Sequence, residues 1–353
     1  MHLLKSFKNR VNGYKMMCKI AIRPFISKIN FRIGRNPVIE STPAGNSYIP
    51  NPFQAVLLIS ADFELAWAWQ YARGVESPLT LALEKARLER RNLPEIVKVC
   101  EKFDIPVTWA TVGHLFLESC QRENTIAHEE LPRPPHFENP YSRFSGNDWF
   151  AHDPCTDVNT DPEWYCPDLI RMILDSSVNH EIGCHTFSHI NCADDSCPPE
   201  VLRAELQACR QIAEQWQIPL ASFVHPGYSI GNLDILAKEG FTNFRTNDRN
   251  VLGYPRKHAN GLWEFEQTAE FVYRKGWSID YHIYRYKEII NRAIKSNTVC
   301  VIWFHPSFDP KVVDEILPEV FRYIDQRRHE LFVTTHTEYI NWINHPDEHK
   351  SKT

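Results

Sequence analysis

Several features are missing from the sequence, and each absence argues against a class of protein. The first fifty residues contain no uninterrupted apolar run, so we expect neither a signal peptide nor a transmembrane span there, short of an unrecognised export route. No C-x-x-C pair occurs among the ten cysteines, and a disulfide framework is not expected without a signal peptide. We therefore predict that most cysteines are buried apolar groups in a reducing cytoplasm. A zinc knuckle at Cys184, Cys192 and Cys197 is the less favoured alternative.

The basic residues are concentrated at the N-terminus. Residues 1–50 hold nine Lys or Arg and one acid, Glu40, whereas the remainder has 30 basic and 43 acidic residues and a net charge of −13. A nucleic-acid partner is therefore not expected, because the main domain has no excess of positive charge. The stretch 15–31 mixes Lys with Ile, Met and Phe, which predicts either a segment on an anionic membrane surface or a partly disordered leader. We expect a cytoplasmic or membrane-peripheral protein.

The rest of the chain alternates between short apolar runs and helical periodicity. After a linker at 43–52, apolar runs typical of buried strands occur at 56–59, 107–111, 181–185, 221–224, 299–304 and 331–333. Helices are predicted from about 79, with a fresh start at Pro94, and at 168–176, 199–217, 232–238 and 312–328. Such alternation predicts parallel strands with helices outside them, in a barrel or an open doubly wound sheet. No Gly-rich phosphate loop follows the first run, which disfavours the open sheet.

One long segment interrupts this alternation. The span 119–165 holds many Pro, Asn and Asp residues and little periodicity. A loop of this length inside a compact domain is usually a functional insertion or a lid. We accordingly expect a basic leader or membrane-peripheral segment at 1–50, a main domain at 51–345 that carries this insertion, and a tail at 346–353.

Polar side chains suited to metal binding or proton transfer follow three of the predicted strands. Asp62 and Glu64 follow the first strand, His185 and His189 follow a middle one, and His305 follows the last strong one. The carboxyl ends of parallel strands converge on the active site in α/β folds, so we expect these five side chains to meet. A single His at a strand end is more often structural, and it is the convergence that favours a site.

The spacing of these residues indicates how the work would be divided. The segment 185–189, His-Thr-Phe-Ser-His, places two imidazoles four residues apart, where they can bind one cation. Thr186 stands where the zinc-protease motif carries its base, so a base must come from elsewhere. Asp62 and Glu64 point to the same side of an extended segment, so one can complete a metal site and the other can accept a proton. His305 could protonate a leaving amine, or it could merely hydrogen-bond the local backbone.

These segments resemble the motifs of the polysaccharide deacetylase (NodB-homology) family, also called carbohydrate esterase family four, over about 56–335. The sequence HEIGCHTFSH at 180–189 is similar to the second motif, whose two histidines ligate the metal. SADFE at 60–64 resembles a variant of the first motif, FVHPGY at 223–228 resembles the third, and VIWFHP at 301–306 resembles the fifth.

The resemblance implies an α/β fold, a distorted (β/α) barrel of about seven strands, with 51–345 as the catalytic domain. It implies Zn²⁺ or another divalent ion such as Co²⁺, Ni²⁺ or Mn²⁺. The site residues that it implies are Glu64, His185 and His189 as metal ligands, Asp62 as catalytic base, His305 as general acid and, as substrate or oxyanion contacts, Pro226, Gly227 and Tyr228.

Two departures from the family pattern concern the groups around the catalytic residues. The third motif usually begins with an Arg that contacts the base, and Val224 occupies that place here. Arg245 or His225 are the candidates to substitute for it. No convincing fourth motif is present, and Asp248 and Asp280 are the candidates for the acid that would orient the general acid.

The resemblance implies metal-dependent hydrolysis of an N-acetyl, or less often O-acetyl, group. The substrate would be a sugar, a polysaccharide or a lipid-linked glycan, in glycan biosynthesis. Ten Trp residues suit aromatic walls around a sugar, although core packing explains any single one better. Two other functions stay open: a related C–N hydrolase acting on a small linear or cyclic amide, and a catalytically impaired glycan-binding homologue, which Val224 would explain. The insertion favours a bulky substrate over a small amide.

Overall fold

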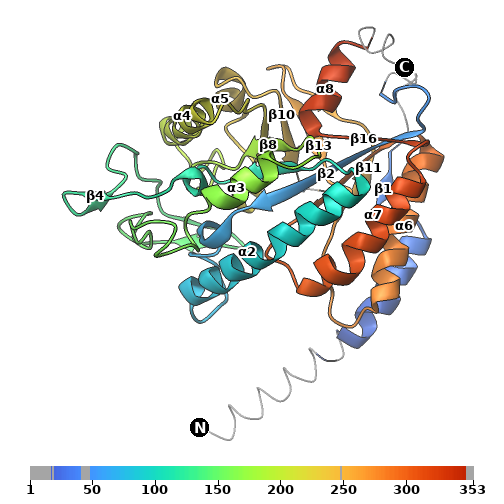
Figure 1. Ribbon diagram of the computed structural model, residues 1–353, viewed down its shortest axis with the longest axis horizontal. Coiled ribbons are helices and arrows are strands. Elements are labelled where there is room, and N and C mark those ends of the chain that lie inside the picture. The colour runs from blue at the N-terminus through green and yellow to red at the C-terminus, as the bar shows by residue number, and fades with distance from the viewer. Residues whose placement is uncertain (1–16, 18–19, 41–47, 247–248, 347–353) are drawn as a thin grey trace, which may run out of the picture.

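A ten-stranded, almost wholly parallel sheet forms the centre of the protein. The computed structural model describes residues 17, 20–40, 48–246 and 249–346 (Figure 1). Along the sheet the strands run β12-β13-β10-β9-β8-β3-β2-β15-β14, and β16 also pairs with β2. Their bounds are β2 (Ala55–Phe63), β3 (Thr108–Thr111), β8 (Glu181–Cys184), β9 (Ser222–Val224), β10 (Asn243–Thr246), β12 (Arg256–Lys257), β13 (Trp263–Glu266), β14 (Ala269–Glu270), β15 (Val299–Phe304) and β16 (Leu331–Thr334).

The strand order is that of a distorted, incomplete barrel. From β2 through β3, β8, β9 and β10 to β13 the neighbours follow chain order, and β15 returns to the other side of β2. An open doubly wound sheet would instead reverse its order at a switch point. The predicted α/β class and distorted barrel are therefore confirmed. The expected count of about seven strands is too low, because the two-residue strands β12 and β14 are too short to show a hydrophobic pattern.

Strand β2 is a central strand of the sheet. All nine of its residues are buried, and it pairs in parallel with β3, β15 and β16. A strand covered on both faces reads as a continuous apolar run, which is why its first half was visible in the sequence. The strand continues beyond the predicted end at 59, so that Asp62 lies within it and Glu64 directly after it.

Helices cover the outside of the sheet, and three parts of the helical prediction are wrong. Their bounds are α2 (Pro78–Phe103), α3 (Pro167–Leu174), α4 (Pro199–Gln215), α5 (Leu233–Lys238), α6 (Ile279–Ser296), α7 (Leu317–Gln326) and α8 (His336–Asn344) (Figure 1). Pro94 does not open a fresh helix, because α2 runs through it. Leu93, Ile96 and Val97 on either side are buried, and their packing outweighs the roughly 3 kcal/mol that an internal Pro costs. Helices α6 and α8 were not predicted, since both carry many polar and aromatic residues between their apolar positions.

The described residues before β2 lie against the main domain. Residues 20–32 form a helix that runs beside α6 (Figure 1). Phe31 is buried there, with the guanidinium of Arg292 3.9 Å from its ring centroid. Further on, β1 (Val38–Ile39) pairs with β11 (Val251–Leu252). The expected linker falls partly outside the described residues, and the division at residue 50 stays a prediction. No helix in the described residues has both the length and the apolar character to cross a membrane.

The span 119–165 is almost devoid of regular structure. It contains four two-residue strands, paired as β4 (Arg122–Glu123) with β5 (Ile126–Ala127) and β6 (Phe137–Glu138) with β7 (Arg143–Phe144). The segment extends from the end of the barrel where the carboxyl end of β2 lies (Figure 1).

Candidate metal centre

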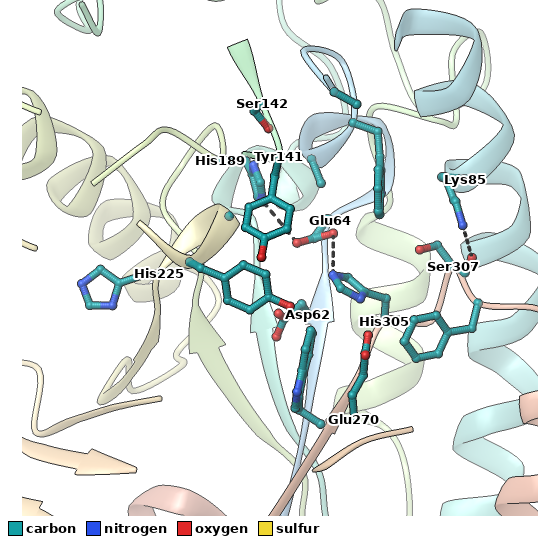
Figure 2. A pocket seen from close by; sticks show the side chains of 17 residues that line it. Asp62, Glu64, Lys85, Tyr141, Ser142, His189, His225, Glu270, His305 and Ser307 are labelled. Carbon is teal, nitrogen blue, oxygen red and sulfur yellow. Dashed lines mark hydrogen bonds and ion pairs between the residues drawn. The ribbon is translucent and has the colours of Figure 1, made fainter. Parts of the chain in front are cut away.

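The five side chains singled out at strand ends come together at the carboxyl edge of the sheet. Asp62 lies in β2 and Glu64 directly after it, His185 and His189 lie in the loop after β8, and His305 directly follows β15. Four of them line one cavity, and Figure 2 shows Asp62, Glu64, His189 and His305 pointing into it. His185 lies behind them and is 1% exposed. Parallel strands place their carboxyl ends together, which is the physical reason for the convergence.

Glu64 is the meeting point of the three imidazoles. Its Oε1 lies 3.0 Å from His185 Nε2 and 3.1 Å from His189 Nε2. Its Oε2 lies 3.6 Å from His305 Nε2 and has no hydrogen-bond partner among the described residues, although it is buried. The ligand atoms of Glu64, His185 and His189 all lie within 4.8 Å of one another, as do those of Asp62, Glu64 and His305.

The surroundings of these groups favour a cation. His185 Nδ1 lies 2.7 Å from the carbonyl oxygen of Val224, which can only accept, so Nδ1 carries the proton and Nε2 is directed at Glu64. Burial opposes the ionisation of Glu64, yet the three facing imidazoles, that of His305 first, hold the pKa of its carboxyl well below the usual range. Burial also disfavours the charged form of His189, and it lowers the pKa of that imidazole. For His185 burial is outweighed by the Glu64 hydrogen bond, and its pKa is raised. Two imidazoles and one carboxylate fit a divalent ion with open positions.

Helix α2 supplies two buried polar residues that position the site, and neither was predicted. Both carboxylate oxygens of Glu89 accept backbone N–H groups, from Glu64 at 3.1 Å and Leu65 at 3.0 Å. These bonds fix the turn after β2, where Leu65 has a φ of 48°. Three residues further on, Asn92 donates to the carbonyl oxygens of Pro306 at 2.8 Å and of Phe308 at 3.0 Å, and so holds the loop after His305. The available signal was a pair of polar residues, three apart, within the apolar stripe of a helix.

Another buried acid holds the loop that carries His185 and His189. Glu205 of α4 accepts the N–H and the hydroxyl of Ser188, each at 2.8 Å. Trp149 of the insertion donates from Nε1 to the carbonyl oxygen of Ser188 at 3.1 Å. Burial raises the pKa of Glu205 to about 7. This loop is therefore braced from both the barrel and the insertion.

The structure selects Arg245 as the group that contacts Asp62. Its Nη2 donates to Asp62 Oδ2 at 2.7 Å, its Nη1 donates to Ser60 at 2.7 Å, and the guanidinium stacks on Trp303 at 4.6 Å from the ring centroid. Arg245 and Val224 are paired residues on the neighbouring parallel strands β10 and β9. The guanidinium thus comes from the strand next to the one that carries it in the family motif.

The other candidate does not reach the base. His225 Nε2 donates to the carbonyl oxygen of Gly231 at 3.0 Å, and burial lowers the pKa of His225 to about 4. The sequence left Arg245 and His225 open as alternatives, and the expectation for His225 is wrong.

Of the two acids suggested as the orienting group for His305, the structure tests only Asp280. Asp280 is exposed in the first turn of α6, which contradicts the suggestion, and Asp248 lies outside the described residues. Besides Asp62 and Glu64, the cavity also holds Glu270, at the end of β14 (Figure 2). Burial raises the pKa of Glu270, and the imidazole of His305 opposes that rise. Glu270 follows a strand of two residues, too short to be recognised in the sequence.

The cavity has a volume of about 270 Å³, and several aromatic side chains line it. Trp69, Trp303 and Phe308 surround His305, with ring centroids 5.0–6.0 Å away. Gly227 and Tyr228, expected to contact substrate, line the cavity, whereas Pro226 lines a smaller hollow beside it. The insertion contributes its own wall through Tyr141 and Ser142.

The cysteines considered for a zinc knuckle lie elsewhere. Cys184, Cys192 and Cys197 are buried, and the sulfurs of the last two point to backbone carbonyl oxygens, of Ile190 at 3.5 Å and Pro198 at 3.7 Å. Within the described residues, these three do not gather as a ligand group.

Comparisons with known proteins agree with this fold. The family model for polysaccharide deacetylase matches residues 84–246, which include the loop 185–189 but neither the end of β2 nor His305. No curated protein matches the chain in sequence.

Solved structures share the fold over most of its length. Two proteins described as polysaccharide deacetylases, from Mycobacterium smegmatis and Pseudomonas aeruginosa PAO1, superpose with TM-scores of 0.55 and 0.58 at 12% identity. Each comparison covers 87% of this chain and 96% of the other. The Puue allantoinase gives a TM-score of 0.57 at 15% identity, covering 87% of this chain and 95% of the other. The chain is therefore similar in sequence to the polysaccharide deacetylase family over residues 84–246, and it shares the fold of these solved structures.

Proposed function

We propose that this protein is a divalent-metal-dependent hydrolase that removes an N-acetyl or O-acetyl group from a sugar. The observation that carries the proposal is the convergence of Glu64, His185 and His189 on one point, at 3.0 and 3.1 Å, beside Asp62 and His305. An ion held by these three ligands, Zn²⁺ or another divalent metal, would lower the pKa of water and polarise the acyl carbonyl.

Asp62 is placed to act as the base. Arg245 occupies its Oδ2, while its Oδ1 is buried without a hydrogen-bond partner among the described residues. The free oxygen is therefore the one that takes a proton from the attacking water. The bond to Arg245 fixes the carboxylate in position, which is the role that the arginine of the third motif has in the family that this chain resembles.

His305 stands on the opposite side of Glu64 and is placed to donate a proton to the leaving nitrogen or oxygen. The aromatic rings around it hold the imidazole in place. A backbone N–H at Gly227 or Tyr228 is the proposed contact for the oxyanion, since both residues line the cavity.

The cavity size limits the substrate. Small-molecule sites usually measure about 300–1,000 Å³, and this cavity of about 270 Å³ lies just below that range. We propose that a single acetylated sugar residue enters it, either free or at the end of a polysaccharide or lipid-linked glycan, with aromatic rings against its faces. A small amide is the second candidate, because Tyr141 of the insertion narrows the cavity where a bulky substrate would need space.

Metal analysis combined with acetate release from a panel of acetylated sugars tests the proposal. His185→Ala should lose the ion, whereas Asp62→Asn and His305→Ala should keep it and lose about 10²–10⁴-fold in kcat. His329→Ala is the matched control, because that histidine's side chain is 75% exposed. Full metal content and activity in His185→Ala would show that the mechanism is wrong. Turnover of a small amide with no acetate from any sugar would select the second candidate.

We also propose a cytoplasmic, membrane-peripheral location through the helix 20–32. The large apolar side chains of Ile22, Phe25 and Ile29 are 51%, 67% and 41% exposed, and they recur at a spacing that places them on one face. Exposed Arg23 and Lys28 lie among them. An apolar stripe with adjacent cations suits a surface of anionic lipid.

A further inference from the structure

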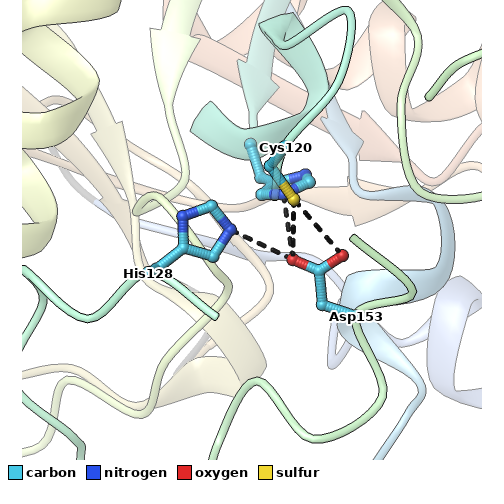
Figure 3. Close-up of side chains that lie close together, drawn as sticks. Cys120, His128 and Asp153 are labelled. Carbon is cyan, nitrogen blue, oxygen red and sulfur yellow. Dashed lines mark hydrogen bonds and ion pairs between the residues drawn. The ribbon is translucent and has the colours of Figure 1, made fainter. Parts of the chain in front are cut away.

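We propose that His114, Cys120, His128 and Asp153 form a second metal site, separate from the catalytic one, that binds zinc in a structural role. The four side chains lie together where the insertion meets the barrel, and Figure 3 shows Cys120 and His128 directed at the carboxylate of Asp153. One ligand atom from each lies within 4.8 Å of the others. This inference does not depend on the proposed function.

The distances are close to those of a tetrahedral site. Asp153 Oδ2 lies 3.2 Å from His114 Nε2, 3.0 Å from His128 Nε2 and 3.5 Å from Cys120 Sγ. Around a tetrahedral zinc ion with bonds of about 2.0–2.3 Å, the ligand atoms lie about 3.3–3.8 Å apart. Small side-chain rotations would therefore bring all four atoms to bonding distance.

The orientation of His114 points to a cation between these groups. Its Nδ1 lies 3.2 Å from the carbonyl oxygen of Trp164. A carbonyl only accepts, so Nδ1 carries the proton and the neutral ring presents the lone pair of Nε2. That nitrogen is fully buried, has no hydrogen-bond partner among the described residues, and faces the Asp153 carboxylate. Two electron-rich atoms at this distance repel each other unless a cation lies beside both, and a backbone carbonyl is the usual outer partner of a metal-binding histidine.

Asp153 has one oxygen left for an ion. Its Oδ1 accepts the N–H of Cys155 at 2.9 Å and the hydroxyl of Tyr165 at 3.2 Å, which leaves Oδ2 directed at the two imidazoles. A thiolate from Cys120 and this carboxylate would balance the charge of a divalent ion. Mixed sulfur, nitrogen and oxygen ligands in tetrahedral number are typical of zinc. Four protein ligands leave no open position, which indicates a structural rather than a catalytic site.

The position of the cluster shows what the ion would hold together. His114 belongs to the short helix η2 (Gly113–Phe116) after β3, and the other three ligands belong to the insertion. The N–H of His114 donates to the carbonyl oxygen of Phe187, inside the loop that carries the catalytic histidines. The ion would therefore tie the insertion, and with it the cavity wall at Tyr141, to the catalytic metal loop.

Cobalt substitution provides a direct test, because a thiolate bound to Co²⁺ gives a charge-transfer absorption and the catalytic ligands include no sulfur. The wild type and each variant are loaded with Co²⁺ for absorption spectra. Separate samples of the same proteins, produced in cells grown with zinc, are analysed for their zinc content. We expect the thiolate band in the wild type and in His185→Ala/His189→Ala, which should also retain one zinc site. Cys120→Ser should lose the band. Cys155→Ser is the matched control, since this neighbouring cysteine is equally half-buried and should keep the band.

Two results would overturn the proposal. The first combines two findings: the wild type lacks the thiolate band, and the His185→Ala/His189→Ala variant holds no metal. In that case the four side chains would form only an ion pair between His114 and Asp153. The second is a band lost in Cys155→Ser and kept in Cys120→Ser. The cobalt spectrum of the wild type and the metal content of the histidine variant remain decisive even if Cys120→Ser does not fold. Absence of acetate release would bear on the proposed function alone.

Discussion

Arg245→Ala tests the reasoning about the catalytic base most directly. The Arg245 side chain is 1% exposed and that of Asp62 is 6% exposed, so removing the guanidinium leaves a carboxylate buried without its partner. Loss of one member of a buried ion pair costs about 3–5 kcal/mol. With an unfolding entropy of roughly 2.1 cal/mol/K per residue, that cost lowers the unfolding midpoint by about 4–7 °C for a chain of this length. Calorimetry at constant metal concentration measures it.

The activity should respond more strongly than the stability suggests. Without Arg245 the Asp62 carboxylate is free to rotate away from the attacking water, and a positioned base contributes about 10²–10⁴-fold. We expect kcat to fall within that range while metal content is unchanged. Arg245→Lys should recover only part of the loss, because an ammonium cannot bond Asp62 and Ser60 together with the fixed geometry of a guanidinium.

Exchanging the residues at 224 and 245 separates the effect of the guanidinium on Asp62 from its effect on protein stability. Val224 and Arg245 are paired across β9 and β10, about 4.8 Å apart as neighbouring parallel strands are, so Val224→Arg/Arg245→Val moves the guanidinium to the usual family position. The double variant should be more active than Arg245→Val alone. Arg249→Ala is the control, because its side chain is 50% exposed and solvent screens its ion pairs. An Arg245→Ala protein with the stability and kcat of the wild type would refute the assigned role.

Three further outcomes are expected. Glu89→Gln places an amide N–H against a backbone N–H, so it should displace Glu64 and weaken metal binding about 10–100-fold. Glu84→Gln, at an exposed position of the same helix, should leave metal affinity unchanged, and equal affinities of the two variants would contradict the role of Glu89. For Glu205, the folded pKa of about 7 exceeds the ordinary value of 4.5 for a glutamate, so the folded state keeps a proton that the unfolded state has lost. Its contribution is complete below pH 4.5 and is lost as pH rises through 7, and Glu205→Gln should flatten the decline in unfolding free energy over that window by about 3 kcal/mol. An unchanged pH slope in urea titrations would argue against it. Phe25→Asp should weaken sedimentation with vesicles of phosphatidylserine; equal sedimentation with the wild type would exclude the lipid contact.

The sequence was most informative where one local signal sufficed. The runs 56–59 and 299–304 are strands because a strand buried on both faces must be apolar throughout. Residues that leave such strands must be at the carboxyl edge, so the gathering of Asp62, Glu64 and His305 followed from parallel topology alone. Helix α6 escaped prediction because its apolar positions are spread among polar and aromatic residues, and only packing against β2, β15 and α7 shows which face is buried.

The second cluster shows a different limit. His114, Cys120, His128 and Asp153 are separated by irregular chain, and no periodicity or spacing rule predicts where such a chain turns back. Their meeting depends on the left-handed backbone at His128 and on the contacts of the insertion with the barrel. Linear spacing therefore carried no signal for this site.

By itself, the sequence determined the parallel α/β class and the edge at which the chemistry lies, because hydrophobic periodicity and strand direction are local properties. Tertiary structure decided which guanidinium contacts Asp62, since Val224 and Arg245 are distant in sequence and become equivalent only as paired residues of adjacent strands. It also decided that buried Glu89, Asn92 and Glu205 hold the site loops, because a polar residue in an apolar stripe reveals its partner only when the helix is packed.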